Sequence, residues 1–334
     1  MMLSCPRAVA VALALAAHAA AAAYTAQLLY QFPSHAQWVE NMAVRPNGHL
    51  LLTTFDRARV YELAPSQQQQ TPRLVAALPA ADAALGIAEI RPDVFAVATG
   101  RLNRTSFHLD GSARIDTLDF TCRGCATQPA IATAAALLPH AKLPNGLAAL
   151  HRSSVVLCAD SATGTIYRAD TATGAVHVAL HDPALAPAPT AADDDDPFLA
   201  LLGVNGLQVP GDGFVYVTST SARLLGRYAL DNAAAAAALE VLARYAAPRS
   251  PDDFAVARNG TVFGAVPLDS VSVVAVLPGK KGLRDVRFLV DHDERMQRPT
   301  SVVLSRDETT LYVSTGGRNV PGGKGGQVFA VRLT

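Results

Sequence analysis

One short pattern of polar and apolar positions returns six times along the chain. A first residue, which is polar in five of the six copies, begins a short apolar run, and a tight turn then leads into a second apolar run. The copies are spaced by 45, 60, 60, 47 and 48 residues and begin at Glu40, Leu85, Asn145, Asn205, Asp252 and Thr300. Repeats of about 40–50 residues that are rich in short strands are typical of a β-propeller, with one blade per repeat. The pattern therefore predicts an all-β, six-bladed β-propeller.

The last repeat lacks an outermost strand, and residues 27–32 can supply it from the other end of the chain. Such closure would remove an open sheet edge. We expect two long insertions, 111–143 and 182–204, to overhang the channel mouth where the six first positions lie, because long loops in compact folds are often lids. The second insertion carries the acidic run 193–196, which is either part of a lid or a solvated loop.

The first 23 residues have the order of a secretory signal. A short segment ends at Arg7, an apolar stretch covers residues 8–17, and small residues precede Tyr24. The apolar stretch is too short for a membrane span, and the order is typical of a cleaved signal peptide. We expect a signal peptide over residues 1–23, one propeller domain over residues 24–334, and a protein that is secreted or held in the lumen of the secretory pathway.

The cysteines and two sequons fit that compartment. Cys122 and Cys125 can close a small disulfide where the surroundings are oxidising. Cys158 lies inside an apolar run and is expected to be a buried free thiol. Asn103 and Asn259 each open an Asn-x-Thr triplet and are candidate glycosylation sites.

The numbers of acidic and basic residues limit the kinds of binding partner that the sequence suggests. The chain has 28 basic and 28 acidic residues, which gives no case for a nucleic-acid partner. Beyond the N-terminal stretch, no segment is long and apolar enough to suggest a membrane partner. We expect a monomer that acts on a small molecule.

Four of the six first positions carry oxygen ligands. Glu40 and Asp252 supply charge, and Asn145 and Asn205 supply neutral carbonyl oxygens. Such a set suits Ca²⁺, which takes six to eight oxygens, better than Zn²⁺, which prefers His and Cys. The alternative is that these residues only form turns. In the metal interpretation Asp252 and Glu40 are also the candidate catalytic residues, because either can relay a proton.

Residues that follow the second strand of a repeat should lie at the same mouth. Phe55, Arg101, Asp160 and Ser161 occupy such places and are the candidate substrate-binding residues, although turn-forming residues are also common there. The chain has no Gly-x-Ser-x-Gly elbow and no dinucleotide-binding glycine pattern. The motifs therefore favour neither a serine hydrolase nor a nucleotide enzyme.

The tetrad carries a resemblance to a known family. Glu40, Asn145-Gly, Asn205-Gly-Leu and Pro251-Asp252 look like the metal-ligand positions of the senescence-marker-protein/gluconolactonase/luciferin-regenerating-enzyme family. That family consists of six-bladed propellers with a central divalent metal, and many members are lactonases or esterases. The resemblance covers nearly the whole mature chain. One departure is Leu143, which stands where lactonases of the family usually carry an arginine.

The amino-acid sequence of the repeats also resembles that of a fungal branch of the family, whose members occur in secondary-metabolite gene clusters. It is visible in residues 40–48, 85–97, 203–207 and 252–256. Some members of that branch are hetero-Diels–Alderases, which join a tropolone quinone methide to a terpene such as humulene. Three functions therefore compete. The resemblance and Leu143 favour such a cyclase, the alternative is a metal-dependent lactonase or esterase, and the third is a non-catalytic binding propeller.

Overall fold

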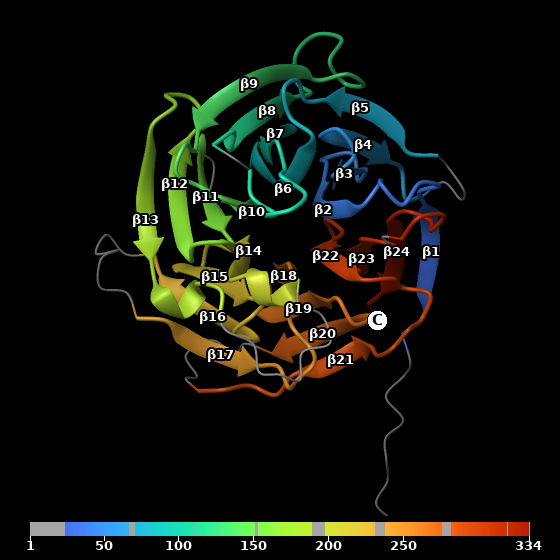
Figure 1. Ribbon diagram of the computed structural model, residues 1–334. Helices are drawn as coiled ribbons and strands as arrows, with labels where there is room; N and C mark the ends of the chain where they lie inside the picture. Colours follow the sequence, from blue (N-terminus) through green and yellow to red (C-terminus); the bar gives the residue numbers. More distant parts are fainter. Residues whose placement is uncertain are drawn as a thin grey trace, which may run out of the picture.

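The chain forms a six-bladed β-propeller, as the sequence predicts (Figure 1). The computed structural model describes residues 24–66, 71–109, 111–150, 153–188, 198–230, 238–275, 282–318 and 320–333. The expected signal peptide and the acidic run 193–196 lie outside these residues. Within them, no helix is long and apolar enough to cross a membrane.

Each blade is a four-stranded antiparallel sheet, and in the first five blades the strands run in chain order from the axis to the rim. Blade one contains β2 (Val39–Val44), β3 (Leu50–Thr54), β4 (Arg59–Leu63) and β5 (Arg73–Ala77). Blade two contains β6 (Ala83–Arg91), β7 (Val94–Gly100), β8 (Arg114–Asp119) and β9 (Ala130–Leu137), and blade three contains β10 (Pro144–Ala149), β11 (Val155–Asp160), β12 (Thr165–Asp170) and β13 (Val176–His181). Blade four contains β14 (Val204–Gln208), β15 (Phe214–Ser219), β16 (Leu224–Ala229) and β17 (Glu240–Arg244), and blade five contains β18 (Phe254–Val256), β19 (Thr261–Val266), β20 (Ser270–Ala275) and β21 (Arg287–Val290).

The sixth blade is closed by both ends of the chain. It contains β22 (Pro299–Leu304), β23 (Thr310–Thr315) and β24 (Gln327–Arg332), and its rim strand is β1 (Ala26–Gln31). The pairing of β1 with β24 runs from Ala26 opposite Val331 to Gln31 opposite Gln327. Figure 1 shows β1 beside β24 at the rim. The predicted closure is confirmed, and it gives the outer edge of β24 a hydrogen-bonded partner.

Blade two corrects the first predicted insertion. Residues 114–119 and 130–137 of this insertion form β8 and β9, so they complete a blade and are not a loop over the tetrad. The disulfide-bonded pair Cys122 and Cys125 lies in the turn between these strands. In each of the first five blades, the turn between the third and fourth strands lies at one end of the propeller, and the inner strand starts at the other end. The cause of the error is the alanine-rich sequence of β9, which shows no alternation of polar and apolar residues.

The predicted free thiol is buried, and the two asparagines of the predicted glycosylation sites are exposed. Cys158 is a buried free thiol in β11, and burial raises its pKa. Asn103 and Asn259 are exposed, and their side-chain oxygens accept backbone N–H groups two residues ahead, from Thr105 and Thr261. The second insertion contains two one-turn 3₁₀ helices, η1 (Pro183–Leu185) and η2 (Leu199–Leu201), and leads into β14.

A β-bulge recurs where five of the inner strands begin. The register of the inner pair shifts between Val39 and Asn41 in β2, and at the same place of the repeat in β6, β10, β14 and β22. A bulge sets two residues against one on the neighbouring strand and redirects a side chain. The bulges therefore change the alternation of side chains at the first two positions of the repeats.

The closure of the ring should depend on Phe32, which follows β1. Its ring is 2% exposed and lies 5.1 Å from the rings of Tyr30 and Tyr61. We expect Phe32→Ala to lower the free energy of unfolding by about 3–5 kcal/mol, because it removes a buried aromatic ring and leaves a cavity. Leu28→Ala is the matched control, since Leu28 lies in the same terminal segment but is 45% exposed. Denaturant unfolding in which both variants lose equal stability would contradict this role.

Candidate metal centre

The predicted tetrad meets on the propeller axis. Glu40, Asn145 and Asn205 lie near the starts of β2, β10 and β14, and Asp252 lies two residues before β18. All four are buried, with exposures of 7, 5, 1 and 8%. Asn205 Nδ2 donates to Asp252 Oδ1 at 2.7 Å, and Glu40 accepts a hydrogen bond from the Asn145 side chain. The structure thus groups the four as two amide–carboxylate pairs.

Hydroxyl groups of neighbouring blades hold the backbone at these positions. Thr218 in β15 donates to the carbonyl oxygen of Asp252 at 2.6 Å, and Thr220 donates to that of Pro251 at 2.9 Å. Thr300 donates to the carbonyl oxygen of Val39 at 2.8 Å. Each of these bonds joins one blade to the residues at or just before the start of the inner strand of the next. The site is therefore built on rigid strands of several blades.

The two carboxyl groups are costly to ionise. Burial raises the pKa of Glu40 to about 7, and the hydrogen bonds from Trp38 and Asn145 oppose that rise. Burial raises the pKa of Asp252 well above its usual range, and the nearby charges of Glu40 and Asp253 add to the effect. The positive charge of Arg298 favours ionisation of both. Two carboxylates that repel each other in a buried site are the arrangement that a bound cation stabilises.

The donor set fits a hard divalent cation. Asn205 uses its amide hydrogens on Asp252 and Thr220 Oγ1, which leaves Oδ1 buried and without a hydrogen-bond partner within the described part of the chain. A buried unpaired carbonyl oxygen is costly unless something binds it. The described residues hold no group of three or more His, Cys, Asp or Glu that could bind a metal, and the tetrad itself contains two carboxylates and two amides.

A second polar layer lies one residue further along the inner strands. Asp253 Oδ2 accepts hydrogen bonds from Asn41 Nδ2 and from Ser301 Oγ, both at 2.9 Å. Burial raises the pKa of Asp253 to about 6. On the other blades this position is glycine, and a Cβ on Gly146 would lie 2.1 Å from the carbonyl oxygen of Asn205. Glycine there allows the inner strands to approach, which keeps the tetrad close.

One side of the mouth is apolar and aromatic. The ring of Trp38 stacks on Phe55 at 5.9 Å, and the rings of Phe107 and Phe198 lie 4.4 Å apart. These side chains belong to one hydrophobic cluster, which also contains Leu85, Leu102, Leu143, Leu199 and Leu202. Leu85 is the first residue of the second repeat, and Leu143 precedes Asn145 by two residues. These aromatic and leucine side chains pack beside the tetrad, and we call them the apolar wall.

The other predicted substrate-binding residues have diverse contacts. Asp160 is buried and accepts hydrogen bonds from the N–H groups of Lys142 and Leu143, so its carboxylate organises the chain that leads into Asn145. Ser161 is buried beside it, and its Oγ has no hydrogen-bond partner within the described residues. Arg101 is exposed, its backbone N–H donates to Ser112 Oγ, and Ser112 Oγ donates to its carbonyl oxygen.

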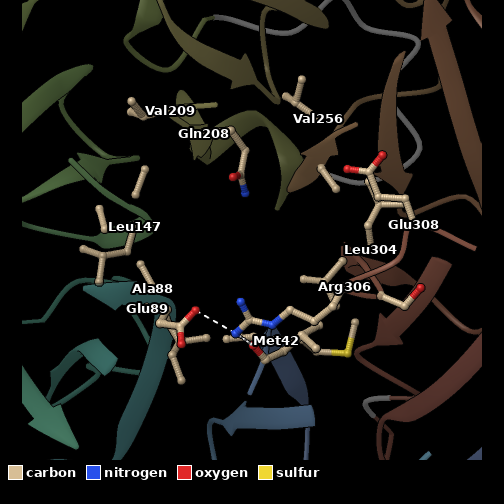
Figure 2. Close-up of a pocket in the computed structure, with 18 residues that line it drawn as sticks. Met42, Ala88, Glu89, Leu147, Gln208, Val209, Val256, Leu304, Arg306 and Glu308 are labelled. Atoms are coloured by element: carbon tan, nitrogen blue, oxygen red, sulfur yellow. Dashed lines mark hydrogen bonds and ion pairs between the residues drawn. The ribbon is translucent and has the colours of Figure 1, made fainter. Parts of the chain in front are cut away.

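A cavity of about 390 Å³ opens at the opposite end of the axis (Figure 2). The far ends of the inner strands line it, and Figure 2 shows Gln208 and Arg306 pointing into it. Arg306 Nη2 lies 2.7 Å from Glu89 Oε2, and Glu308 pairs with Arg258. Its charged groups compensate one another, so it lacks the unbalanced carboxylates of the tetrad.

Sequence reasoning missed three residues that contact or influence the tetrad. Trp38 donates to Glu40, Arg298 affects both carboxyl groups, and Asp253 lies in the layer beneath. Trp38 and Arg298 both stand two residues before the first residue of a repeat, and Asp253 stands one residue after it. Only a comparison of all six repeats at these two positions would have identified them from the sequence.

The raised pKa values predict an effect of pH on stability when no cation is present. Glu40 binds its proton more tightly in the folded protein than at its ordinary pKa of 4.5, so folding becomes less favourable as pH rises from about 4.5 to about 7. Below that window the carboxyl group is protonated in both states and makes no difference. Asp252 acts in the same direction.

In a chelator, wild type should lose about 1–3 kcal/mol relative to Glu40→Gln across this window, and Ca²⁺ should restore it. Thermal melts at a series of pH values measure the difference. Parallel curves for the two proteins would contradict the assignment.

No family model matches the chain, and no curated protein matches it in sequence. Solved structures do match. A luciferin-regenerating enzyme is 16% identical with a TM-score of 0.62, covering 93% of this chain and 95% of its own. Regucalcin from Agrobacterium tumefaciens, a calcium-binding protein, is 16% identical with a TM-score of 0.58, over 93% and 96%. A gluconolactonase from Xanthomonas campestris is 15% identical with a TM-score of 0.57, over 93% and 90%. At these identities the likeness shows that the chain shares their six-bladed fold.

Proposed function

We propose that the protein is a divalent-cation-dependent hydrolase of lactones or esters, related to the gluconolactonase and luciferin-regenerating-enzyme propellers. The observation that carries the proposal is the buried Asn205 Oδ1, unpaired among the described residues, beside the carboxyl groups of Asp252 and Glu40. The fold shared with a gluconolactonase and a calcium-binding regucalcin supports it. The sequence alone favoured a cyclase, and we place the hydrolase first because of the charge arrangement of the site.

Glu40, Asn145, Asn205 and Asp252 would hold the cation, for which Ca²⁺ is the first choice. A divalent cation bound there supplies Lewis acidity toward a carbonyl oxygen. Asp252, whose Oδ1 is held in place by Asn205, would accept the proton of a water that adds to the carbonyl carbon, and it would return that proton to the alkoxide oxygen as the acyl C–O bond breaks. Glu40 supplies the second negative charge, and Trp38 and Asn145 fix its orientation.

The apolar wall suggests which substrates the site takes. Trp38 and Phe107 are partly exposed and offer rings, and the buried Leu143 places no charge near Asn145 for a hydroxylated substrate. Burial of apolar surface contributes roughly 25 cal/mol per Å². We therefore propose an apolar or aromatic lactone or ester as the substrate, in preference to a sugar lactone.

Asp252→Asn should lower the hydrolysis rate by at least about 100-fold, because the variant loses the base and one charge of the site. The assay offers purified protein a panel of aliphatic, aromatic and sugar lactones and esters with Ca²⁺, Mg²⁺ or Mn²⁺, and with chelator. Asp253→Asn is the matched control, since its carboxylate is held by Asn41 and Ser301 in the next layer. Its turnover should fall far less. Equal losses in both variants, or turnover that persists in chelator, would refute the proposal.

A second candidate is the hetero-Diels–Alderase-like cyclase of fungal secondary metabolism. The apolar wall favours it, because a cycloaddition can be accelerated by holding two apolar reactants in the reactive orientation. The residues of the wall, and not a proton relay, would then carry the rate.

The test incubates the protein with a tropolone quinone-methide precursor and humulene, with and without chelator. For a cyclase we expect a stereoselective adduct above the spontaneous background, retained in Asp252→Asn and reduced in Phe55→Ala. An adduct formed only at the background rate would exclude this candidate.

A further inference from the structure

Trp38 is the only tryptophan of the chain, and it lies two residues before Glu40. Its indole Nε1 donates to Glu40 Oε2 at 2.7 Å. This bond joins a neutral donor to a carboxylate, and charge-assisted bonds of this kind are short and strong. Glu40 also accepts a hydrogen bond from the side chain of Asn145.

The indole is held on more than one side. The ring of Phe55 stacks on it at 5.9 Å with 25° between the planes, and the N–H of Phe55 donates to the Trp38 carbonyl at 3.2 Å. The guanidinium carbon of Arg298 lies 5.3 Å from the ring centroid. Blade one and blade six therefore clamp the same side chain between them.

Gly316 makes room for this ring. A Cβ at Gly316 would lie 2.7 Å from Cε2 and 2.8 Å from Cδ2 of Trp38, closer than real Cβ contacts allow. The backbone of Gly316 does not adopt the left-handed conformation, so glycine is needed there for space. The N–H of Gly316 donates to the carbonyl of Arg298 at 2.8 Å, which fixes the glycine against the ring.

We propose that Trp38 is a positioning residue of the axial site: its clamped indole N–H fixes the Glu40 carboxylate in the orientation that binds a divalent cation, and its ring reports that binding. The inference rests on the cation site proposed above. Loss of the N–H frees one oxygen of Glu40 to turn away from the axis. Groups that orient metal ligands typically contribute 10–100-fold to metal affinity.

The test titrates purified protein with Ca²⁺, Mg²⁺ and Mn²⁺ in turn by calorimetry. Trp38→Phe keeps an aromatic ring and removes the N–H, and it should weaken binding of the preferred ion about 10-fold or more. Gly316→Ala keeps the indole and displaces it, and it should weaken binding by a similar factor. Tyr245→Phe is the control, because it also removes one buried hydrogen bond, to Ser272 at 2.9 Å, between blades four and five. Its affinity should stay within about 2-fold of wild type.

Fluorescence of the single tryptophan gives a second readout that a loss of stability alone would not produce. In wild type the emission should change with ion concentration and saturate at the calorimetric dissociation constant. In Gly316→Ala, which retains Trp38, this response should shift to the weaker constant or vanish.

The outcomes separate the two proposals. Wild type that binds none of the three ions overturns the cation site and the role of Trp38 together. Wild type that binds an ion, while Trp38→Phe and Gly316→Ala bind it equally well, overturns the role of Trp38 alone. An emission that stays constant while calorimetry records binding in wild type also contradicts the inference, and it does so even where a variant fails to fold.

Discussion

The burial of two carboxyl groups on one axis is the constraint on which the rest of the site depends. Burial raises the cost of ionising both, the charge of Glu40 adds to the cost for Asp252, and the propeller surrounds them with strands instead of water. A fold tolerates such a cluster only where hydrogen bonds or a cation compensate the charge. The amides of Asn145 and Asn205 compensate part of it, and Asn205 Oδ1 adds an oxygen that lacks a partner among the described residues. The geometry is understandable as a cation site and is costly without one.

The scaffold meets this constraint through its repeated inner strands. The bulges at the starts of the inner strands redirect side chains at the first two positions of the repeats. Glycine at Gly86, Gly146 and Gly206 brings neighbouring inner strands within reach of one another. Hydroxyl groups such as that of Thr218 then tie one blade to the next. Closure by β1 and β24 joins the two ends of the ring, and it keeps blades one and six in place beside Trp38.

Much of this was predictable because it repeats. The spacing of the six first positions predicted the blades, and the missing outer strand predicted the closure by residues 27–32. The tetrad followed from residue type at equivalent positions, which pseudo-symmetry carries to one place. Blade two was misread, since β9 is rich in alanine and carries no alternation. Arg298 and Asp253 were missed because their contacts join blades that lie far apart in the sequence, and Trp38 was missed because only its place in the repeat distinguishes it. The bond from Asn41 to Asp253, for example, spans 212 residues.

The central claim is that these four residues bind one divalent cation, and a crystal structure grown with Ca²⁺ tests it most directly. The account predicts electron density for one ion on the axis, about 2.3–2.6 Å from oxygens of Glu40, Asn145, Asn205 and Asp252. The amide of Asn205 should present Oδ1 to the ion. An axis that holds only water between the four side chains in saturating Ca²⁺, or an ion bound in the cavity beside Arg306, would contradict the account.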